Sequence, residues 1–157
     1  MNPLTLRRKE VAFFDAHPGV AFDEGTNREI IGKMRVAVKS SPQVDVPITD
    51  HFAEGLYGRE IFVPKGTVTI ARIHKQSQLQ IMLTGSMSVF TEKGLVKIVA
   101  PRIWVAPAGE EKATLYNEDT RRITILGTDL KDAKLIFDTY TADTPSDILL
   151  KCEGETP

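Results

Sequence analysis

Residues 64–85 read PKGTVTIARIHKQSQLQIMLTG, and this stretch decides the fold. It predicts two strands, 67–74 and 78–83, joined by a polar bend at 75–77 and followed by a turn at 84–86. Side chains on a strand alternate between its two faces. The first predicted strand carries apolar residues on both faces, which indicates a strand covered on both sides, as in a closed barrel or a sandwich.

One face of this first strand ends in two basic side chains. Arg72 and His74 share that face with Val68 and Ile70, and Gln78 follows directly after the bend. Because buried cations are rare unless they have a partner, this end of the strand either opens to solvent or meets an anion. We therefore expect Arg72, His74 and Gln78 to point into one cavity.

Short apolar runs separated by Gly and Pro turns continue along the chain. Pro47 marks an edge strand, and Gly94 ends a four-residue hairpin loop. Strands of this length, about ten residues apart, indicate an antiparallel sandwich or barrel. The fold class is therefore mainly β. The further predicted strands are 44–49, 61–64, 86–90, 95–99, 101–106, 111–116 and 122–127.

Two helices flank the predicted barrel. Thr26 and Glu29 have the spacing of a capping box, and apolar residues recur at helical spacing behind them, which predicts a helix at about 27–39. A short C-terminal helix is expected after Asp129, which is its predicted cap. The chain then divides into an N-terminal extension, 1–55, a barrel, 56–128, and a C-terminal helix and tail, 129–157, packed on the same domain.

The two ends of the chain carry apolar residues that need a surface to cover them. Leu6, Val11, Phe13 and Phe14 form the apolar face of a possible short helix that ends before Pro18. Either the barrel's own outer surface or a partner subunit covers the two phenylalanines. Near the other end, the apolar run 148–150 also needs a surface.

Residues 49–60 lie just ahead of a predicted strand, and the cluster of His51, Tyr57, Arg59 and Glu60 is a candidate for the rim of the cavity. His51 and Tyr57 are included as possible ligand-binding residues. The competing interpretation is a loop in which Arg59 and Glu60 point to opposite faces and find separate surface partners. We favour this second interpretation for Glu60.

Composition excludes several classes of protein. The 157 residues fit one domain, and 20 basic residues against 21 acidic ones provide no broad basic field for nucleic acid. Cys152 is the single cysteine, so no intrachain disulfide forms, and this fits a reducing compartment. Neither a membrane-spanning run nor a signal peptide is expected. We expect a protein of the cytoplasm, the host's if the protein is viral, or of a virion.

Residues 66–85 resemble the first sequence motif of the cupin family, G-x5-H-x-H-x3-E-x6-G. Gly66, Gly85 and His74 match its two glycines and its second histidine. Arg72 stands at its first histidine, and Gln78 stands at its glutamate.

Residues 101–117, PRIWVAPAGEEKATLYN, resemble the second cupin motif, G-x5-P-x-G-x2-H-x3-N. Pro107 and Gly109 match, whereas Pro101 replaces the first glycine, Lys112 the histidine and Tyr116 the asparagine. The resemblance covers roughly 57–128. It implies a single cupin-type antiparallel β-barrel, or jelly roll.

The cupin resemblance would also imply a divalent metal at these motif positions. The substitutions argue against one, since a divalent ion prefers imidazoles and carboxylates, and Arg72 and Lys112 would repel it. We expect neither a metal nor another cofactor. The same cations favour an anionic ligand held by Arg72, His74, Gln78, Lys112 and Tyr116.

Neighbouring cations should lower the pKa of His74 and make it a candidate catalytic base, with Tyr116 as a candidate proton donor. This inventory resembles the metal-independent sugar-nucleotide epimerases among the cupins. Those enzymes support their histidine with a carboxylate, which we cannot assign here, because Glu110 and Glu111 lie at a predicted turn.

Residues 51–67, HFAEGLYGREIFVPKGT, resemble as a run small cupin-like proteins of tailed bacteriophages, which implies a viral origin. Three functions remain open. The first is a metal-free protein of ligand binding or assembly, which recognises an anionic small molecule or a protein partner, as a homo-oligomer or with a virion protein. The second is a metal-independent epimerase or isomerase, and the third is a purely structural virion component. We expect the first, and therefore a binding protein rather than an enzyme.

Overall fold

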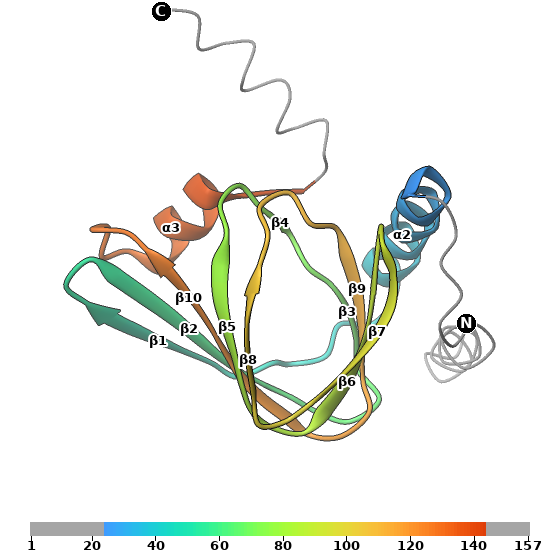
Figure 1. The fold of residues 1–157 in the computed structure, drawn as a ribbon, viewed down its shortest axis with the longest axis horizontal. Helices are drawn as coiled ribbons and strands as arrows, with labels where there is room; N and C mark the ends of the chain where they lie inside the picture. The colour runs from blue at the N-terminus through green and yellow to red at the C-terminus, as the bar shows by residue number, and fades with distance from the viewer. Residues whose placement is uncertain (1–23, 144–157) are drawn as a thin grey trace, which may run out of the picture.

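Two antiparallel sheets face each other and form the barrel (Figure 1). The computed structural model describes residues 24–143, so the predictions for Phe13, Phe14, Cys152 and 148–150 lie outside the described residues. The first sheet has five strands, in the spatial order β1 (Ile48–Ala53), β2 (Leu56–Val63), β10 (Thr120–Gly127), β5 (Gln78–Thr84) and β8 (Arg102–Ala106). The second sheet has four, in the order β3 (Val68–Ile70), β9 (Lys112–Tyr116), β6 (Ser86–Thr91) and β7 (Gly94–Val99).

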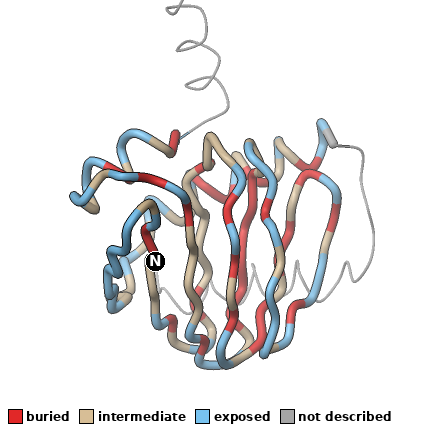
Figure 2. The backbone as a smooth tube through the Cα atoms, turned by 60° about the vertical axis from the view of Figure 1, so that its left-hand side comes forward, coloured by how far each residue is buried: buried red, intermediate tan, exposed pale blue. Residues whose placement is uncertain are grey.

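The space between the two sheets holds an apolar core. Met82 from the first sheet and Met87 from the second are buried there, and Figure 2 shows the buried positions spread along the strands of both sheets. The predicted architecture is therefore confirmed: a mainly β, jelly-roll barrel with an N-terminal helix and a short C-terminal helix. Neither helix among residues 24–143 is long and apolar enough to cross a membrane.

Two turn glycines have conformations that other residues rarely adopt. Gly66 has φ +79° and Gly85 has φ +93°. At Gly85, between β5 and β6, an added Cβ would lie 2.3 Å from the hydroxyl oxygen of Thr120. Both the backbone conformation and this close approach require glycine here, which explains why the sequence retains a glycine at the turn.

The predicted strand 67–74 is not continuous. The chain leaves the second sheet after β3 and forms β4 (Ile73–His74), which pairs with β11 (Thr141–Ala142) near the C-terminal helix. Lys75 donates its backbone N–H to the carbonyl of Tyr140 at 2.8 Å. The prediction of one strand was wrong because the C-terminal segment offers a second partner for residues 73–75. Arg72 therefore lies at the break.

Helix α2 (Glu24–Lys39) packs against the outer face of the second sheet, where Ile31 and Met34 meet Phe90 and Leu115. The helix begins before the predicted capping box, so Thr26 lies inside its first turn and is not the cap. The first turn is also held against the second sheet, because the fully buried Asn27 donates its side-chain N–H to the backbone carbonyl of Glu92 at 2.7 Å.

Helix α3 (Ala133–Tyr140) lies at the end of the barrel near β2 and β10 (Figure 1). Its cap is Asp132, which accepts a hydrogen bond from the backbone N–H of Leu135, and not Asp129 as predicted. Residues 128–130 instead form a turn, in which the hydroxyl of Thr128 accepts from the N–H of Leu130 at 3.2 Å. Ile136 is the buried residue of α3 and packs with Tyr57 of β2.

The segment 49–53 forms strand β1 and is not the rim loop that the sequence suggested. It pairs along its whole length with β2, and the two strands form a hairpin that extends to one side of the barrel (Figure 1). Strand alternation then places Asp50 and Tyr57 on the inner face of this hairpin and His51 on the outer face. The hairpin thus supplies one wall of a cavity.

Candidate ligand-binding site

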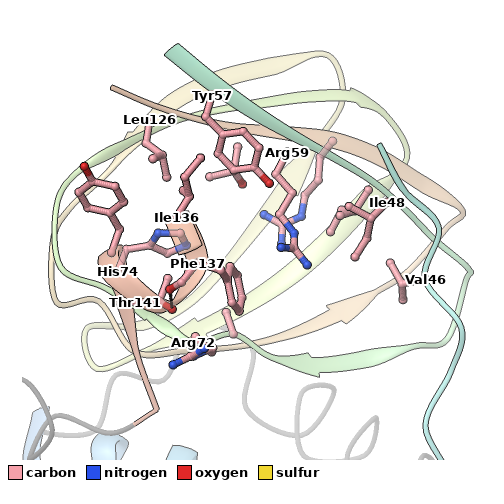
Figure 3. A pocket seen from close by; sticks show the side chains of 15 residues that line it. Val46, Ile48, Tyr57, Arg59, Arg72, His74, Leu126, Ile136, Phe137 and Thr141 are labelled. Atoms are coloured by element: carbon pink, nitrogen blue, oxygen red, sulfur yellow. Dashed lines mark hydrogen bonds between the residues drawn. The ribbon is translucent and has the colours of Figure 1, made fainter. Parts of the chain in front are cut away.

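A cavity of about 210 Å³ lies between the inner face of the five-stranded sheet and the segment formed by α3 and β11 (Figure 3). Residues from the β3–β4 break close a third side. The lining combines apolar side chains with three arginines and one histidine. The lining residues are Val46, Ile48, Tyr57, Arg59, Ile61, Ala71, Arg72, His74, Arg122, Thr124, Leu126, Ile136, Phe137, Tyr140 and Thr141.

Strand alternation explains why two of the arginines point inward. In β2, residues 57, 59 and 61 share the inner face, and in β10 residues 122, 124 and 126 do so. The two strands pair with Thr124 opposite Arg59 and Arg122 opposite Ile61. Arg59 and Arg122 are therefore diagonal neighbours on adjacent strands, close enough for long side chains to reach one ligand.

Phe137 of α3 lies between two guanidinium groups (Figure 3). The Cζ atom of Arg59 is 4.5 Å from the centre of the ring, and that of Arg72 is 5.0 Å from it. Arg72 also lies 3.6 Å from a carboxylate oxygen of Asp138 and 3.3 Å from one of Asp143. The charge of Arg72 is therefore largely compensated by carboxylates of the C-terminal segment.

Among the described residues, Arg59 and Arg122 form no such ion pair, and Arg59 instead hydrogen-bonds to the hydroxyl of Tyr57. None of the ion pairs within residues 24–143 involves either of them. Arg122 instead donates to two neutral groups, the hydroxyl of Tyr116 and the side-chain oxygen of Gln80, both at 3.1 Å. A guanidinium that is taken out of water without an anionic partner is unfavourable. A negative charge in the cavity would therefore be electrostatically favourable.

His74 faces the cavity with a buried Nδ1 atom for which the described residues supply no hydrogen-bond partner. Burial lowers its pKa from 6.5 to about 4, and the positive charges of Lys112, Arg122 and Arg59 act in the same direction. The imidazole is therefore neutral at pH 7 and keeps hydrogen-bonding capacity for a ligand. The sequence also predicted a lowered pKa for His74, with Arg72 and Lys112 as the responsible cations. In the structure Lys112 contributes, together with Arg122 and Arg59 in place of Arg72.

Lys112 lies inside the barrel next to this site without lining the cavity. Burial lowers its pKa from 10.5 to about 8, and Arg122 contributes in the same direction. The carboxylate of Glu110 opposes the shift, with one oxygen 3.6 Å from the ammonium nitrogen. Lys112 therefore adds to the positive field of the site while keeping its own partner.

Tyr57 lines the cavity and donates its hydroxyl proton to a carboxylate oxygen of Asp50 at 2.5 Å. Burial raises its pKa from 10.0 to about 12, and the hydrogen bond to Asp50 contributes to the increase. Tyr57 thus stays protonated, and its proton is directed away from any ligand.

The structure brings together only some of the residues proposed from the sequence. Arg72, His74 and Tyr57 line the cavity, whereas Gln78, Lys112 and Tyr116 are buried deeper in the barrel. Gln78 uses its amide in the core, donating to the carbonyl of Gln76 at 2.8 Å and accepting from Gln80 at 3.1 Å.

His51 lies on the outer face of the β1–β2 hairpin and contacts a carboxylate oxygen of Glu60 at 2.7 Å. The sequence left Arg59 open between the rim of the cavity and a surface partner, and it did not point to Arg122 or Phe137. The alternation of residues 57, 59 and 61 and of residues 122, 124 and 126 was the signal for the two arginines. That signal becomes informative only once β2 and β10 are known to be neighbours.

The residues at the cupin motif positions do not fit a divalent metal. Arg72 and Gln78 supply no anionic ligand atom, and Lys112 is an ammonium group next to His74. Within the described part of the chain, no group of three or more His, Cys, Asp or Glu side chains could hold a metal ion. A doubly charged ion about 4 Å from one guanidinium would be disfavoured by about 8 kcal/mol at an effective dielectric constant of 20.

We therefore predict that the protein takes up no transition metal. After exposure to excess Zn²⁺ or Mn²⁺ and removal of free metal, elemental analysis should find well under one ion per chain. Neither ion should raise the temperature of unfolding. A retained ion near one equivalent, lost in a His74→Gln variant, would contradict this prediction.

No protein-family model matches this sequence, and no curated protein matches it. Solved structures similar to this chain include a cupin superfamily protein from Desulfitobacterium hafniense, with 12% identity over 57% of this chain and 84% of that one, at a TM-score of 0.48. KdgF from a Halomonas species is 16% identical over 59% and 88%, with a TM-score of 0.48. A cupin 2 conserved barrel domain protein from Salinispora arenicola is 13% identical over 62% and 87%, with a TM-score of 0.47.

At these identities the similarity concerns the fold alone. Two facing antiparallel sheets whose strands alternate inward and outward define a double-sheet jelly roll, the class of barrel that includes the cupins. The fold does not determine the activity, because one barrel supports many functions. The function has to be inferred from the cavity.

Proposed function

We propose that this protein is a metal-free, cupin-type binding protein that holds a small organic anion in the cavity beneath α3. The observation that carries the proposal is the charge of the lining. Three arginines and a histidine line the cavity, and within residues 24–143 no carboxylate does so. Two of these arginines, Arg59 and Arg122, have no ion-pair partner among the described side chains.

Partial burial of the two guanidinium groups favours the binding of an anion. A partly buried guanidinium has lost hydration, and an anion that accepts its hydrogen bonds would restore that loss. The planar guanidinium fork matches a carboxylate or phosphate group in two parallel hydrogen bonds. The unpartnered Nδ1 of His74 offers one further contact at the same cavity.

A pair of probes of equal shape tests this proposal. Benzoate and benzamide differ in charge and are nearly identical in size, so calorimetric titration of both isolates the role of the charge. We expect benzoate or phosphate to bind and benzamide to bind at least tenfold more weakly, about 1.4 kcal/mol. The proposal fails if no anion binds at millimolar concentration, or if benzamide binds as tightly as benzoate.

A metal-independent isomerase or epimerase is the alternative function. A neutral His74 that faces the cavity favours it, because such an imidazole can accept a proton near pH 7. Two features support it less. Tyr116, the candidate acid, lies outside the lining and its hydroxyl accepts from Arg122, and no carboxylate orients His74.

A purely structural virion component is the third reading. It expects a filled barrel in which Arg72 is already paired, and Arg72 does pair with Asp138 and Asp143. The remaining cavity of about 210 Å³ supports ligand binding instead. The proposed bacteriophage source rests on the resemblance of residues 51–67 alone.

We also propose that a second copy of the chain covers the outer face of the five-stranded sheet. Strand register aligns Val105, Leu79 and Ile125 in one row across β8, β5 and β10, and Ile103, Ile81 and Ile123 in the next. Ile103 and Val105 are 66% and 65% exposed. No described element covers these rows, since α2 packs on the other sheet.

The shape of this face favours a copy of itself. A pleated surface of Ile, Leu and Val packs well against another pleated surface, and a twofold axis lets one patch serve both subunits. The outer face of the five-stranded sheet is a pleated apolar surface of this kind, so a second copy of the chain would present a matching one. The proposal of a homo-oligomer is therefore a face-to-face dimer of five-stranded sheets.

Ile103→Lys should convert this dimer into a monomer, because it introduces a charge at the exposed β8 end of the apolar rows, where a second copy would bury it. Sedimentation velocity at micromolar concentration measures the outcome. Val36→Lys is the matched control, since Val36 is 68% exposed on α2 and should leave the dimer intact. A wild-type protein that sediments as a monomer would contradict the proposed interface.

A further inference from the structure

We infer that the ligand is a small carboxylate with an apolar body, such as a short aliphatic or an aromatic acid, and not a phosphate ester or a sugar derivative. This inference rests on the proposed anion-binding function and specifies its ligand class. It depends on three properties of the cavity: the partners of its hydroxyl groups, its apolar walls and its size.

The four hydroxyl groups of the lining already have partners within the protein. Each of these contacts uses hydrogen-bonding capacity that a ligand would otherwise use. They are Tyr57 with Asp50 at 2.5 Å, Thr124 with Gln80 at 2.9 Å, Thr141 with the carbonyl of Phe137 at 2.5 Å, and Tyr140 with Thr128 at 3.1 Å.

A sugar would therefore bring hydroxyl groups into a site with few acceptors. The lining contains no carboxylate among the described residues. The groups left for a ligand are the guanidinium N–H groups of Arg59 and Arg122 that their protein contacts do not use. The Nε atom of Arg72 and the Nδ1 atom of His74 also have no hydrogen-bond partner among the described residues. A ligand hydroxyl that loses water without gaining a partner is strongly disfavoured. The site should therefore discriminate against sugars, because their hydroxyl groups would be left without hydrogen-bond partners.

The remaining walls are apolar and favour an apolar ligand body. Figure 3 shows Val46 and Ile48 on one side of Arg59, and Leu126 and Ile136 on the other. Ile61, beside Arg59 on β2, and Phe137 extend the apolar surface. A chain or ring attached to a carboxylate can contact these walls while the carboxylate meets the guanidinium groups.

Size restricts the ligand further. The cavity volume of about 210 Å³ lies below the range of roughly 300–1,000 Å³ that is usual for drug-sized ligands. A nucleotide sugar is at least of that size and would project far outside the cavity. An acid with a short chain or one aromatic ring suits the volume better.

A homologous series tests the inference. We expect the affinity of the full chain for acetate, butanoate and hexanoate to rise about three- to fourfold for each added methylene until the cavity is full. Inorganic phosphate and glucose 6-phosphate should bind more weakly than butanoate. Ile48→Ser should weaken hexanoate binding several-fold more than acetate binding. Val36→Ser should leave the affinities for both acids unchanged.

The outcomes separate this inference from the function on which it rests. If glucose 6-phosphate or phosphate binds more tightly than hexanoate, or if chain length has no effect, the ligand class is wrong and anion binding still stands. If neither carboxylates nor phosphates bind, both are wrong. A rise in affinity along the series that Ile48→Ser reduces supports both.

Discussion

Replacing Arg59 with methionine should weaken the binding of benzoate by about 30-fold or more. A hydrogen bond between charged groups contributes about 2 kcal/mol, which corresponds to about that ratio of affinities. Methionine keeps an unbranched apolar side chain next to Phe137, so the cavity loses the positive charge and little of its wall. Since Arg59 takes part in no ion pair within the described residues, no carboxylate is left without its partner.

Arg121→Met is the matched control for this prediction. Arg121 is in β10, the strand beside β2, and its side chain is 53% exposed on the outer face, where it pairs with Glu60. The Arg121→Met substitution removes the same positive charge from the molecule without changing the cavity. Calorimetry on both variants, after circular dichroism has established that each is folded, separates a local contact from a general effect of net charge. Equal affinities in Arg59→Met and Arg121→Met would overturn the assignment of Arg59.

Acidification from pH 7 to below pH 4 should lower the free energy of unfolding by about 3 kcal/mol through the burial of His74 alone. Its pKa is about 4 in the folded chain, against an ordinary value of 6.5. As the pH falls through this window, the unfolded chain takes up a proton that the folded chain does not. The free energy of unfolding therefore decreases between about pH 6.5 and pH 4, and the loss is complete below pH 4.

Urea unfolding at several pH values measures this effect as a difference between two proteins. In His74→Gln the decrease in unfolding free energy between pH 7 and pH 4 should be smaller than in the wild type by most of that amount. Changes at the carboxylates occur in both proteins and cancel in the comparison. An identical dependence in His74→Gln and the wild type would show that burial of His74 has no such effect.

Local sequence was sufficient for most strands and turns. The strand predicted at 78–83 is β5, and the glycines at 66 and 85 have the positive φ angles that their turns require. Helix boundaries were less predictable. Several polar residues near each helix could act as a cap, and the sequence alone does not show which of them does so, as Asp132 rather than Asp129 does for α3.

The candidate site was only partly predictable for a related reason. Arg72, His74 and Tyr57 were identified from local patterns and Arg59 was left open between the rim and the surface, whereas Arg122 and Phe137 were not identified. Alternation shows which residues of a strand share a face, but it does not show which strands are neighbours. The pairing of β2 with β10 joins segments about 60 residues apart, and the residues between them do not encode it locally.

The sequence by itself determined a mainly β barrel, because alternation and turn chemistry act over a few neighbouring residues. It also indicated that cations replace the metal ligands of the cupin motifs. Only the tertiary structure decided which cations remain without a counter-charge. Asp138 and Asp143 fold back to compensate Arg72, while Arg59 and Arg122 face a cavity without carboxylates among the described residues. Charge compensation depends on distances of a few ångströms between segments far apart in the chain, and such distances exist only once the barrel has closed.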